Sequence, residues 1–389
     1  MRGFSVIRFV PLLLLGLSYG LMVAPTGLYN AEFLTGRGFT AETAGHMYVF
    51  ASVISILLLT MLPAFLSRWG ARSTLIRLTL LVFLGSLGLG FFSSYTFTFV
   101  AFLLFVSVQI LIYSLLDLFV EAKVDGLESI TGRVRGLYLT LINLAFTMGP
   151  FIAGWVITHY SFNHLYLFAA VMALLFLVLV SSVTRKFRDA AYPQVTPIYV
   201  IRLLLKNRTF ATIWGINFLL QLRYAVVVVY LAIYLHQVLG FSLGAVGLMV
   251  TIANIPFILL QFPLGTLSDR WFGEKEMLVA GFVMTCFGGF MLAFTATTSI
   301  PVMTAILMLM FTGAAAIEIM SESYFFKHVK AKDDAYIVAF RMVIPLAYIV
   351  APLIAGGIML ILPMNYNFAA VAAICLLGIP LALSLKDTH

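Results

Sequence analysis

The sequence predicts an all-α integral membrane protein, with twelve transmembrane helices that form two pseudo-symmetric six-helix bundles. The first observation is composition: 62% of the 389 residues are hydrophobic and only 10% are charged, too few charges to cover the surface of a water-soluble domain. The second is a series of twelve apolar segments. The third is a stretch of the first half that recurs in the second. Together they predict a chain whose solvent is a lipid bilayer.

Each apolar segment is long enough to cross the hydrocarbon core of a bilayer, about 30 Å thick, as a helix. A short basic stretch precedes the first segment, as in a signal peptide, but eleven further segments follow, so we interpret it as the first span. The predicted spans are 9–29, 44–66, 74–92, 97–121, 136–158, 164–183, 210–236, 244–264, 277–297, 301–326, 336–361 and 366–385.

The basic residues are distributed asymmetrically along these spans. With the N-terminus in the cytoplasm, every Lys and Arg except Arg37 and Arg223 falls at a cytoplasmic helix end or loop. Membrane proteins keep Lys and Arg on that side, so we expect both termini in the cytoplasm. The net charge of +8 is therefore an orientation signal, and we expect no binding of nucleic acid. The short loops and tails favour a bacterial inner membrane.

A repeat relates the two halves of the chain. Asp117 lies 33 residues before Pro150, and Glu318 lies 34 residues before Pro352. In each copy an acidic helix end, a charged loop and a second apolar helix follow one another, and the second helix ends in GPFIAG or APLIAG. A repeat of this length suggests that the chain consists of two related halves. The predicted domains are an N-terminal bundle, a basic cytoplasmic linker and a C-terminal bundle, at 1–183, 184–209 and 210–389.

Two shorter features support this organisation. The loops RGFT and LGFS place Thr40 and Ser242 before the second and eighth spans, where a hydroxyl can accept a hydrogen bond from a free amide of the first helical turn. Within the linker, the run after Pro197 predicts a short basic amphipathic helix on the inner leaflet. The first part of the linker is equally consistent with a plain solvated connection.

The loop after the eighth predicted span reads GTLSDRWFGEK and resembles the signature loop of the major facilitator superfamily, G-x-x-x-D-R-x-G-R-[RK], with one residue inserted. The matching residues are Gly265, Asp269, Arg270, Gly273 and Lys275. The loop after the second span keeps Arg68, Gly70 and Arg72, with Pro63 in place of Gly and Ser67 in place of Asp. The resemblance covers essentially the full length. It implies a transporter fold without assigning one substrate family.

The GPFIAG stretch resembles the motif G-P-x-x-G-G of the same superfamily, which is associated with antiporters. Gly149, Pro150 and Gly154 match it, and Ala153 replaces the first of the paired glycines. Pro352 and Gly356 occupy the same places in the second copy. Small residues let helices approach closely and proline bends a helix, so we expect both stretches to be close-packed and bent.

Four acidic residues near the cytoplasmic ends of spans 4 and 10 have two interpretations. Asp117 with Glu121, and Glu318 with Glu322, are spaced i, i+4, so each pair shares one helix face. As gate residues they would pair with Arg68, Arg72, Arg133 or Arg135 in the first half, and with Arg270, Lys275 or Arg341 in the second. As coupling residues they would carry protons. We favour the gate for the two outer acids and leave both roles open for the two deeper ones.

Arg223 is the most unusual residue, because it is predicted midway along span 7. Arginine stays ionised in proteins, and charges in the middle of a membrane are rare without a function. By the family resemblance, spans 1, 4, 7 and 10 line a central cavity, into which Arg223 would project. It would bind an anionic substrate group or pair with Glu318 or Asp117, and the alternative is a permanent structural ion pair.

Polar and aromatic residues on the same spans are further candidates for lining the cavity. Each could instead make an ordinary interhelical hydrogen bond or packing contact. They are Tyr19 and Tyr29 on span 1, Gln109 and Tyr113 on span 4, and Asn217, Gln221, Tyr224 and Tyr230 on span 7.

Catalytic, metal and nucleotide sites find no support in the sequence. The histidines lack metal-ligand spacing, no Gly-rich phosphate loop follows a strand, and no Ser/His/Asp set is placed for catalysis. We therefore expect no cofactor and no enzymatic activity. We predict a monomeric secondary active transporter that moves a small organic solute by alternating access, coupled to protons, with export favoured. The alternatives are an importer or uniporter of a small polar or anionic solute, and a non-transporting receptor or assembly partner.

Overall fold

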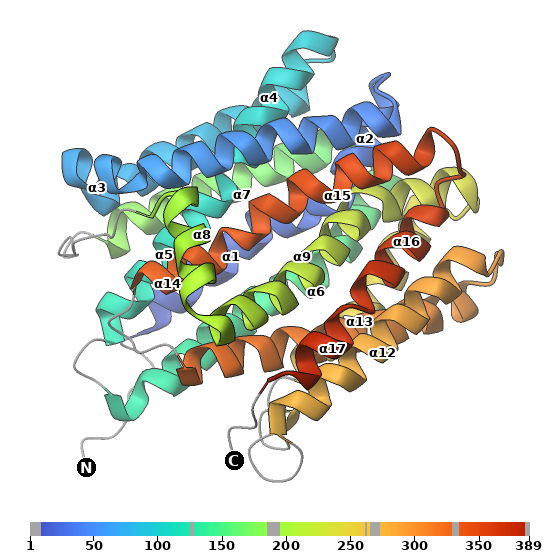
Figure 1. The fold of residues 1–389 in the computed structure, drawn as a ribbon. Helices are drawn as coiled ribbons and strands as arrows, with labels where there is room; N and C mark the ends of the chain where they lie inside the picture. Colours follow the sequence, from blue (N-terminus) through green and yellow to red (C-terminus); the bar gives the residue numbers. More distant parts are fainter. Residues whose placement is uncertain are drawn as a thin grey trace. The chain divides into compact units, whose positions relative to one another are not determined.

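The structure is a computed structural model that describes residues 9–124, 128–184, 195–260, 263–264, 273–328 and 334–385, with the side chains at 121–136, 326, 328, 334 and 335 left undescribed. Within these ranges the chain is helical and contains no strand. Figure 1 shows the helices coloured along the sequence. The prediction of an all-α membrane protein is confirmed.

The helices follow one another with short connections. In the first half they are α1 (Val10–Gly27), α2 (Asn30–Gly36), α3 (Ala41–Phe91), α4 (Tyr95–Ser107), α5 (Gln109–Val124), α6 (Glu128–His159) and α7 (Phe162–Val183). In the second half they are α8 (Pro197–Lys206), α9 (Arg208–Ile233), the π-helix η2 (Tyr234–Val238), α10 (Leu243–Leu259), α12 (Gly273–Phe294), α13 (Ile300–His328), α14 (Asp334–Arg341), α15 (Val343–Met359), α16 (Tyr366–Cys375) and α17 (Gly378–Leu383).

Ten helical stretches of the described chain are long and apolar enough to cross a membrane, and α10 is a shorter apolar helix. The 51 residues of α3 contain one non-helical residue, Gly70, with φ 76° and ψ 159°. A positive φ is easily adopted only by glycine, so Gly70 interrupts α3 where the sequence predicts the loop between spans 2 and 3. If α3 is counted as two crossings and α10 as one, the total is the twelve membrane-spanning helices expected from the sequence. This number of helices stays a prediction.

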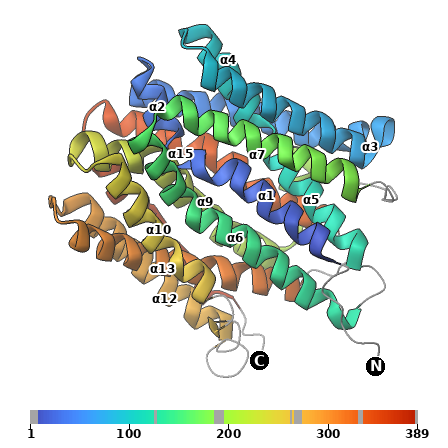
Figure 2. The ribbon, with the colours of Figure 1, turned by 180° about the vertical axis from the view of Figure 1, so that it is seen from behind.

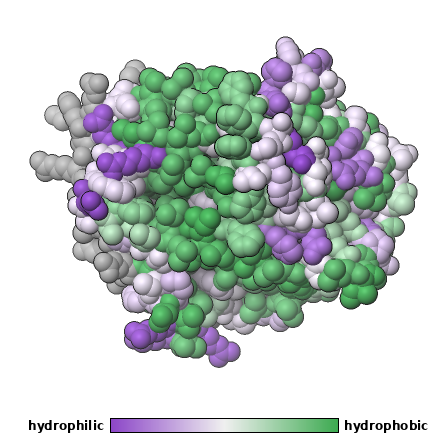
Figure 3. Space-filling view, turned by 90° about the horizontal axis from the view of Figure 1, so that it is seen from above, coloured by the Kyte–Doolittle hydropathy of each residue, from purple (hydrophilic) through white to green (hydrophobic). Residues whose placement is uncertain are grey.

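Apolar side chains are exposed on a scale unusual for a water-soluble protein. Leu205 and Ile361 are 82% and 83% exposed, and many large aliphatic and aromatic residues of other helices are also accessible. Figure 3 shows apolar residues covering much of one face. Contiguous apolar surface is favourable against lipid and unfavourable against water.

The chain divides into two compact units. The first comprises Met1–Gly27 and Ile54–Pro193, and the second comprises Leu28–Val53 and Gln194–His389. The second unit therefore combines α2 and the start of α3 with the helices that follow the linker. The predicted hydroxyl caps lie in this unit and are confirmed: Thr40 accepts from the amide of Thr43 at 3.1 Å, and Ser242 from that of Ala245 at 3.2 Å.

In the first unit, small residues bring α1 and α6 into close contact. A Cβ added at Gly149 of α6 would lie 2.7 Å from the carbonyl carbon of Ala24. One at Gly20 of α1 would lie 2.5 Å from Cβ of Ala145. Figure 2 shows the two helices side by side. The close packing expected from the sequence is thus present at Gly149, where there is no room for a side chain.

In the second unit, α12 and α13 meet in the same way. A Cβ at Gly313 of α13 would lie 2.5 Å from the carbonyl oxygen of Gly281. The hydroxyl of Thr285 on α12 donates to the carbonyl of Met310 on α13, at 2.8 Å. These contacts fix α13, which carries Glu318 and Glu322, against its neighbour.

Candidate functional site

Polar residues form a stripe along α9 in the second unit. Asn217, Gln221 and Tyr224 are spaced i, i+4 and i+7, which places them on one helix face. The Gln221 amide lies 3.5 Å from the side-chain oxygen of Asn217. The Tyr224 hydroxyl donates a 2.5 Å hydrogen bond to a carboxylate oxygen of Glu318 on α13. Of these three predicted residues of α9, Tyr224 contacts one of the two deeper acids.

The two acids of α13 have different partners. Glu322 forms an ion pair with Arg341 of α14, with 2.8 Å between the guanidinium nitrogen and the carboxylate oxygen. Glu318, one turn deeper, forms no ion pair among the described side chains and accepts from the neutral Tyr224 hydroxyl. One carboxylate is therefore neutralised by a cation, whereas the other is held by a group that bears no charge.

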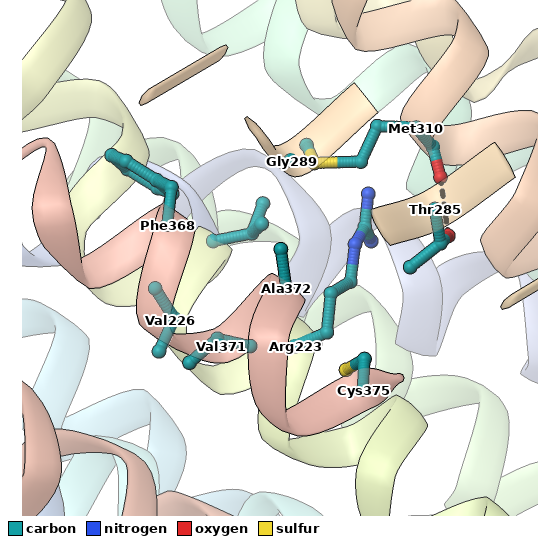
Figure 4. Close-up of a pocket in the computed structure, with 10 residues that line it drawn as sticks. Arg223, Val226, Thr285, Gly289, Met310, Phe368, Val371, Ala372 and Cys375 are labelled. Carbon is teal, nitrogen blue, oxygen red and sulfur yellow. Dashed lines mark hydrogen bonds between the residues drawn. The ribbon is translucent and has the colours of Figure 1, made fainter. Parts of the chain in front are cut away.

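Arg223 lies on a different side of α9 from this stripe and is only 4% exposed. It borders a small cavity between α9, α12, α13 and α16 (Figure 4). Its guanidinium carbon lies 4.2 Å from the ring centre of Phe311 and 5.2 Å from that of Tyr224. Arg223 forms no ion pair with Glu318, and among the described residues its Nε and Nη2 atoms have no hydrogen-bond partner.

The candidate residues of the first unit gather around α5. The Tyr19 hydroxyl on α1 donates to the backbone carbonyl of Gln109 at 3.1 Å. The Tyr19 ring stacks on that of Tyr113, with 6.0 Å between ring centres. Asp117 follows Tyr113 by one helical turn and is half-buried. Gln109, Tyr113 and Asp117 thus line one face of α5, as their spacing predicts. The Glu121 side chain lies outside the described residues.

The signature loops are described only in part. Arg72 donates to the carbonyl of Ser181 at 3.0 Å, and Arg68 lies over the Trp69 ring at 5.9 Å. Gly273 begins α12 with a positive φ of 65°, and Lys275 follows it in the first turn. Gly265, Asp269 and Arg270 lie outside the described residues, so their part in a gate stays a prediction.

The second copy of the helix-bend motif lies in α15. Pro352 and Gly356 fall inside this helix, as Pro150 and Gly154 fall inside α6. A Cβ added at Gly356 would lie 3.8 Å from side-chain atoms of Glu42 and of His46, which are at the start of α3. In the second unit, therefore, the motif faces residues from the first half of the sequence.

Residues 28–53 make polar contacts with η2 and α10 that the sequence did not predict. The Tyr29 hydroxyl donates to the carbonyl of Leu243 at 2.6 Å. The Gln237 amide donates to both carboxylate oxygens of Glu32, at 3.1 and 3.0 Å. Nε2 of His236 lies 3.8 Å from the same carboxylate. A further predicted cavity residue, Tyr230, points its hydroxyl at Gly45. These contacts tie α2 and the start of α3 to the second half.

Glu32, which lies between the first two predicted spans, should make stability depend on pH. Burial raises the pKa of its carboxyl above the ordinary value, and the Gln237 amide and the His236 ring oppose this shift. Because the folded protein binds this proton more tightly than the unfolded chain, stability should rise as pH falls through the raised pKa. We expect the Tm of the wild type, relative to Glu32→Gln, to increase as the pH is lowered from the neutral range toward the ordinary pKa of a glutamate carboxyl.

Thermal unfolding of both proteins across this pH range measures the difference. His236→Gln serves as the control, because it removes the neighbouring ring and keeps the carboxyl. Parallel curves for the wild type and Glu32→Gln would show that Glu32 does not titrate in this range.

Sequence reasoning also missed an ion pair between α12 and α13, in which only the carboxylate is buried. Lys327 Nζ lies 2.5 Å from a carboxylate oxygen of the buried Glu274. Glu274 directly follows Gly273 of the signature loop. Its place next to this motif could have marked it as a candidate for an ion pair. We interpret it as a structural contact between the cytoplasmic ends predicted for the two helices.

Comparisons with known proteins agree with this fold. The family model described as Major Facilitator Superfamily matches residues 213–389. An uncharacterized MFS-type transporter of Methanocaldococcus jannaschii is 26% identical over 181 residues, which cover 45% of this chain and 46% of that protein. The match thus spans about half the length of this curated relative.

Two crystal structures share the fold over nearly the whole chain. One is that of the nucleoside transporter NupG, with a TM-score of 0.74 and 12% identity over 97% of this chain and all of that one. The other is a mutant of NupG, with a TM-score of 0.72 and 13% identity over 97% and 98% of the two chains. Residues 213–389 thus match the major facilitator superfamily, and the two crystal structures share the fold of nearly the whole chain.

Proposed function

We propose that the protein is a secondary active transporter that couples the movement of a small organic solute to protons. The observation that carries this proposal is the hydrogen bond from Tyr224 to Glu318. Glu318 lies on a helix predicted to span the membrane and has no ion-pair partner among the described side chains. It can gain or lose a proton without breaking an ion pair, and the Tyr224 hydroxyl remains available in either state.

The neighbouring acid sharpens this assignment. Glu322 shares the helix face but is neutralised by Arg341 at 2.8 Å, so protonating it would leave a cation without its partner. Such a residue suits a permanent or gate contact. The pair on α13 thus combines one group suited to exchange a proton with one suited to hold helices together. On the repeat, Asp117 is the corresponding proton carrier of the first unit.

The contacts of residues 28–53 supply the element that alternating access requires. Transport of this kind opens a central site to one side of the membrane at a time. In the second unit, Tyr29 and Glu32 hold the start of the chain against η2 and α10. We propose that these contacts close the side opposite the linker and separate when that side opens. Export is favoured because α6 carries the antiporter-like GPFIAG stretch.

Transport by purified protein tests the proposal. A thermal-shift screen over drugs, sugars, nucleosides and organic acids identifies a ligand, because binding to the folded state raises apparent stability. Proteoliposomes with a pH gradient should then move that ligand against its concentration gradient and show ligand-dependent proton flux. Downhill movement without proton flux would support a uniporter, and no movement of any ligand that binds would support a receptor or assembly partner.

A further inference from the structure

An exposed cluster of two arginines and a tryptophan lies at the interruption of α3 in the first unit. The guanidinium carbon of Arg77 lies 4.1 Å from the centre of the Trp69 ring, and that of Arg68 lies 5.9 Å from it. The Phe65 ring stacks on the same indole, with 5.2 Å between ring centres. Contacts of this geometry hold a guanidinium by its flat face. Arg68, Trp69 and Arg77, here called the Arg–Trp cluster, thus fix two positive charges close together.

The interruption at Gly70 brings these residues together. The Thr74 hydroxyl donates to the carbonyl of Gly70 at 2.8 Å and lies 3.4 Å from the carbonyl oxygen of Phe65. Nine residues of continuous helix extend about 14 Å, so the chain turns back between Phe65 and Thr74. Arg77, on the second arm of α3, therefore reaches the ring of Trp69 on the first arm.

The two guanidiniums of the cluster have N–H groups that are accessible to a ligand. Arg68 and Arg77 are exposed, and neither forms a hydrogen bond or an ion pair with another side chain that the structure describes. The signature loop that this stretch resembles carries an acid where Ser67 stands, and the Ser67 hydroxyl donates to the carbonyl of Ala64 at 3.0 Å. Stacking occupies only the flat faces, so the N–H edges can bind an anion in the guanidinium plane.

Acidic residues are scarce around the cluster. The chain contains no Asp or Glu between Glu42 and Asp117, and Asp117 is the only acidic side chain described in the first unit. Arg72, which donates to the carbonyl of Ser181, adds a further positive charge two residues after the turn. The charges at this turn therefore favour an anionic ligand.

Exposed apolar side chains follow the cluster along both arms of α3. On the first arm, Leu57 is 58% exposed, and it lies with the exposed Met61 at intervals of four residues from the cluster. On the second arm, the exposed Leu80 and Leu84, the latter at 56%, lie three and seven residues after Arg77. Residues at these intervals share a helix face, so each arm carries an apolar row that leads to the cluster.

From this arrangement we propose that the turn of α3 binds an anionic phospholipid. The phosphate accepts hydrogen bonds from Arg68 and Arg77, and the acyl chains lie along the two apolar rows. The predicted topology places this turn at the cytoplasmic leaflet, where anionic lipids attract basic residues and tryptophan is favoured at the interface. The bound lipid connects the two arms of α3 and stabilises the first unit. This site does not rest on the proposed transport.

Native mass spectrometry of the purified full chain in detergent tests the site. Phosphatidylglycerol and phosphatidylethanolamine with the same acyl chains are titrated separately. The wild type should bind phosphatidylglycerol saturably and more tightly than phosphatidylethanolamine, because only the first carries a net negative charge. Equal binding of the two lipids would mean that the acyl chains alone are recognised, and it would overturn the proposal.

Three variants assign the binding to the cluster. Arg68→Gln and Arg77→Gln should each weaken phosphatidylglycerol binding about fivefold, and the double variant more. Arg37→Gln is the matched control, because its guanidinium also lies over an aromatic ring, that of Phe33 at 5.0 Å, but on the side predicted to be opposite. It should bind like the wild type. Undiminished binding by the double variant, or an equal loss in Arg37→Gln, would contradict the assignment.

Thermal unfolding gives a second measurement and covers a variant that loses stability. Phosphatidylglycerol should raise the Tm of the wild type and leave that of the double variant at its own lipid-free value. Inorganic phosphate at the same concentration should raise neither. An equal rise with inorganic phosphate would mean that the cluster binds free phosphate, and it would overturn the proposal. None of these measurements involves a gradient or a transported solute, so their failure is distinguishable from failure of the transport proposal.

Discussion

Glu318→Gln should abolish transport driven by a pH gradient and leave solute exchange at equilibrium intact. Glutamine keeps an oxygen that can accept from Tyr224 but cannot release a proton. A gradient of one pH unit is worth about 1.4 kcal/mol per proton, which supports roughly tenfold concentration of a solute moved with one proton. The variant should lose this factor, as measured by uptake and counterflow in the same proteoliposomes.

Glu322→Gln is the matched control, one helical turn away. It removes the carboxylate that pairs with Arg341 at 2.8 Å, so its Tm should fall while uptake driven by the pH gradient remains. Asp117→Asn extends the test to the first unit. If Glu318→Gln and Asp117→Asn both still accumulate solute against a gradient, these acids have only gate or packing roles.

Gly149→Ala should strongly destabilise the first unit, although it adds a single methyl group. That methyl would lie 2.7 and 2.9 Å from the carbonyl carbon and oxygen of Ala24. These are backbone atoms of α1, so one of the two helices must move. Overpacking of this kind typically costs about 1–3 kcal/mol. We expect a lower Tm and a smaller yield of monodisperse protein in detergent.

Gly357→Ala provides the opposite expectation. Gly357 lies inside α15, and nothing stands within 4 Å of where its Cβ would be. Alanine is the better helix former by about 1 kcal/mol, so this variant should be as stable as the wild type or more so. An equal loss of Tm in both variants would mean that added bulk at the α1–α6 contact is not the cause.

The sequence predicted the features that depend on local composition and spacing. The lengths of the apolar segments predicted the helices. Gly70, with its positive φ, interrupts α3 where a loop was predicted. The predicted hydroxyl caps are present at Thr40 and Ser242. The i, i+4 spacing placed Glu318 and Glu322 on one face of α13. Each of these features depends on residues that are close together in the sequence.

The partners of these residues could not be derived in the same way. Arg341 was one of three predicted partners for the acids of α13, but spacing does not reveal that it pairs with Glu322 while Glu318 meets Tyr224, because both partners come from other helices. The buried depth of Arg223 was predictable, but the helices around it were not. The pairing of Glu32 with Gln237 joins residues 205 apart, and nothing in either segment marks it.

Leu28–Val53 belong to the second unit. This has a consequence for producing the protein as two separate fragments. A cut within the linker would yield an N-terminal fragment that carries these 26 residues away from the helices they contact. The C-terminal fragment would then expose the carbonyl of Leu243 and the amide of Gln237 that Tyr29 and Glu32 normally engage. Two separately synthesised fragments thus hold a built-in means of recognising each other, and reassembly of the split protein would depend on it.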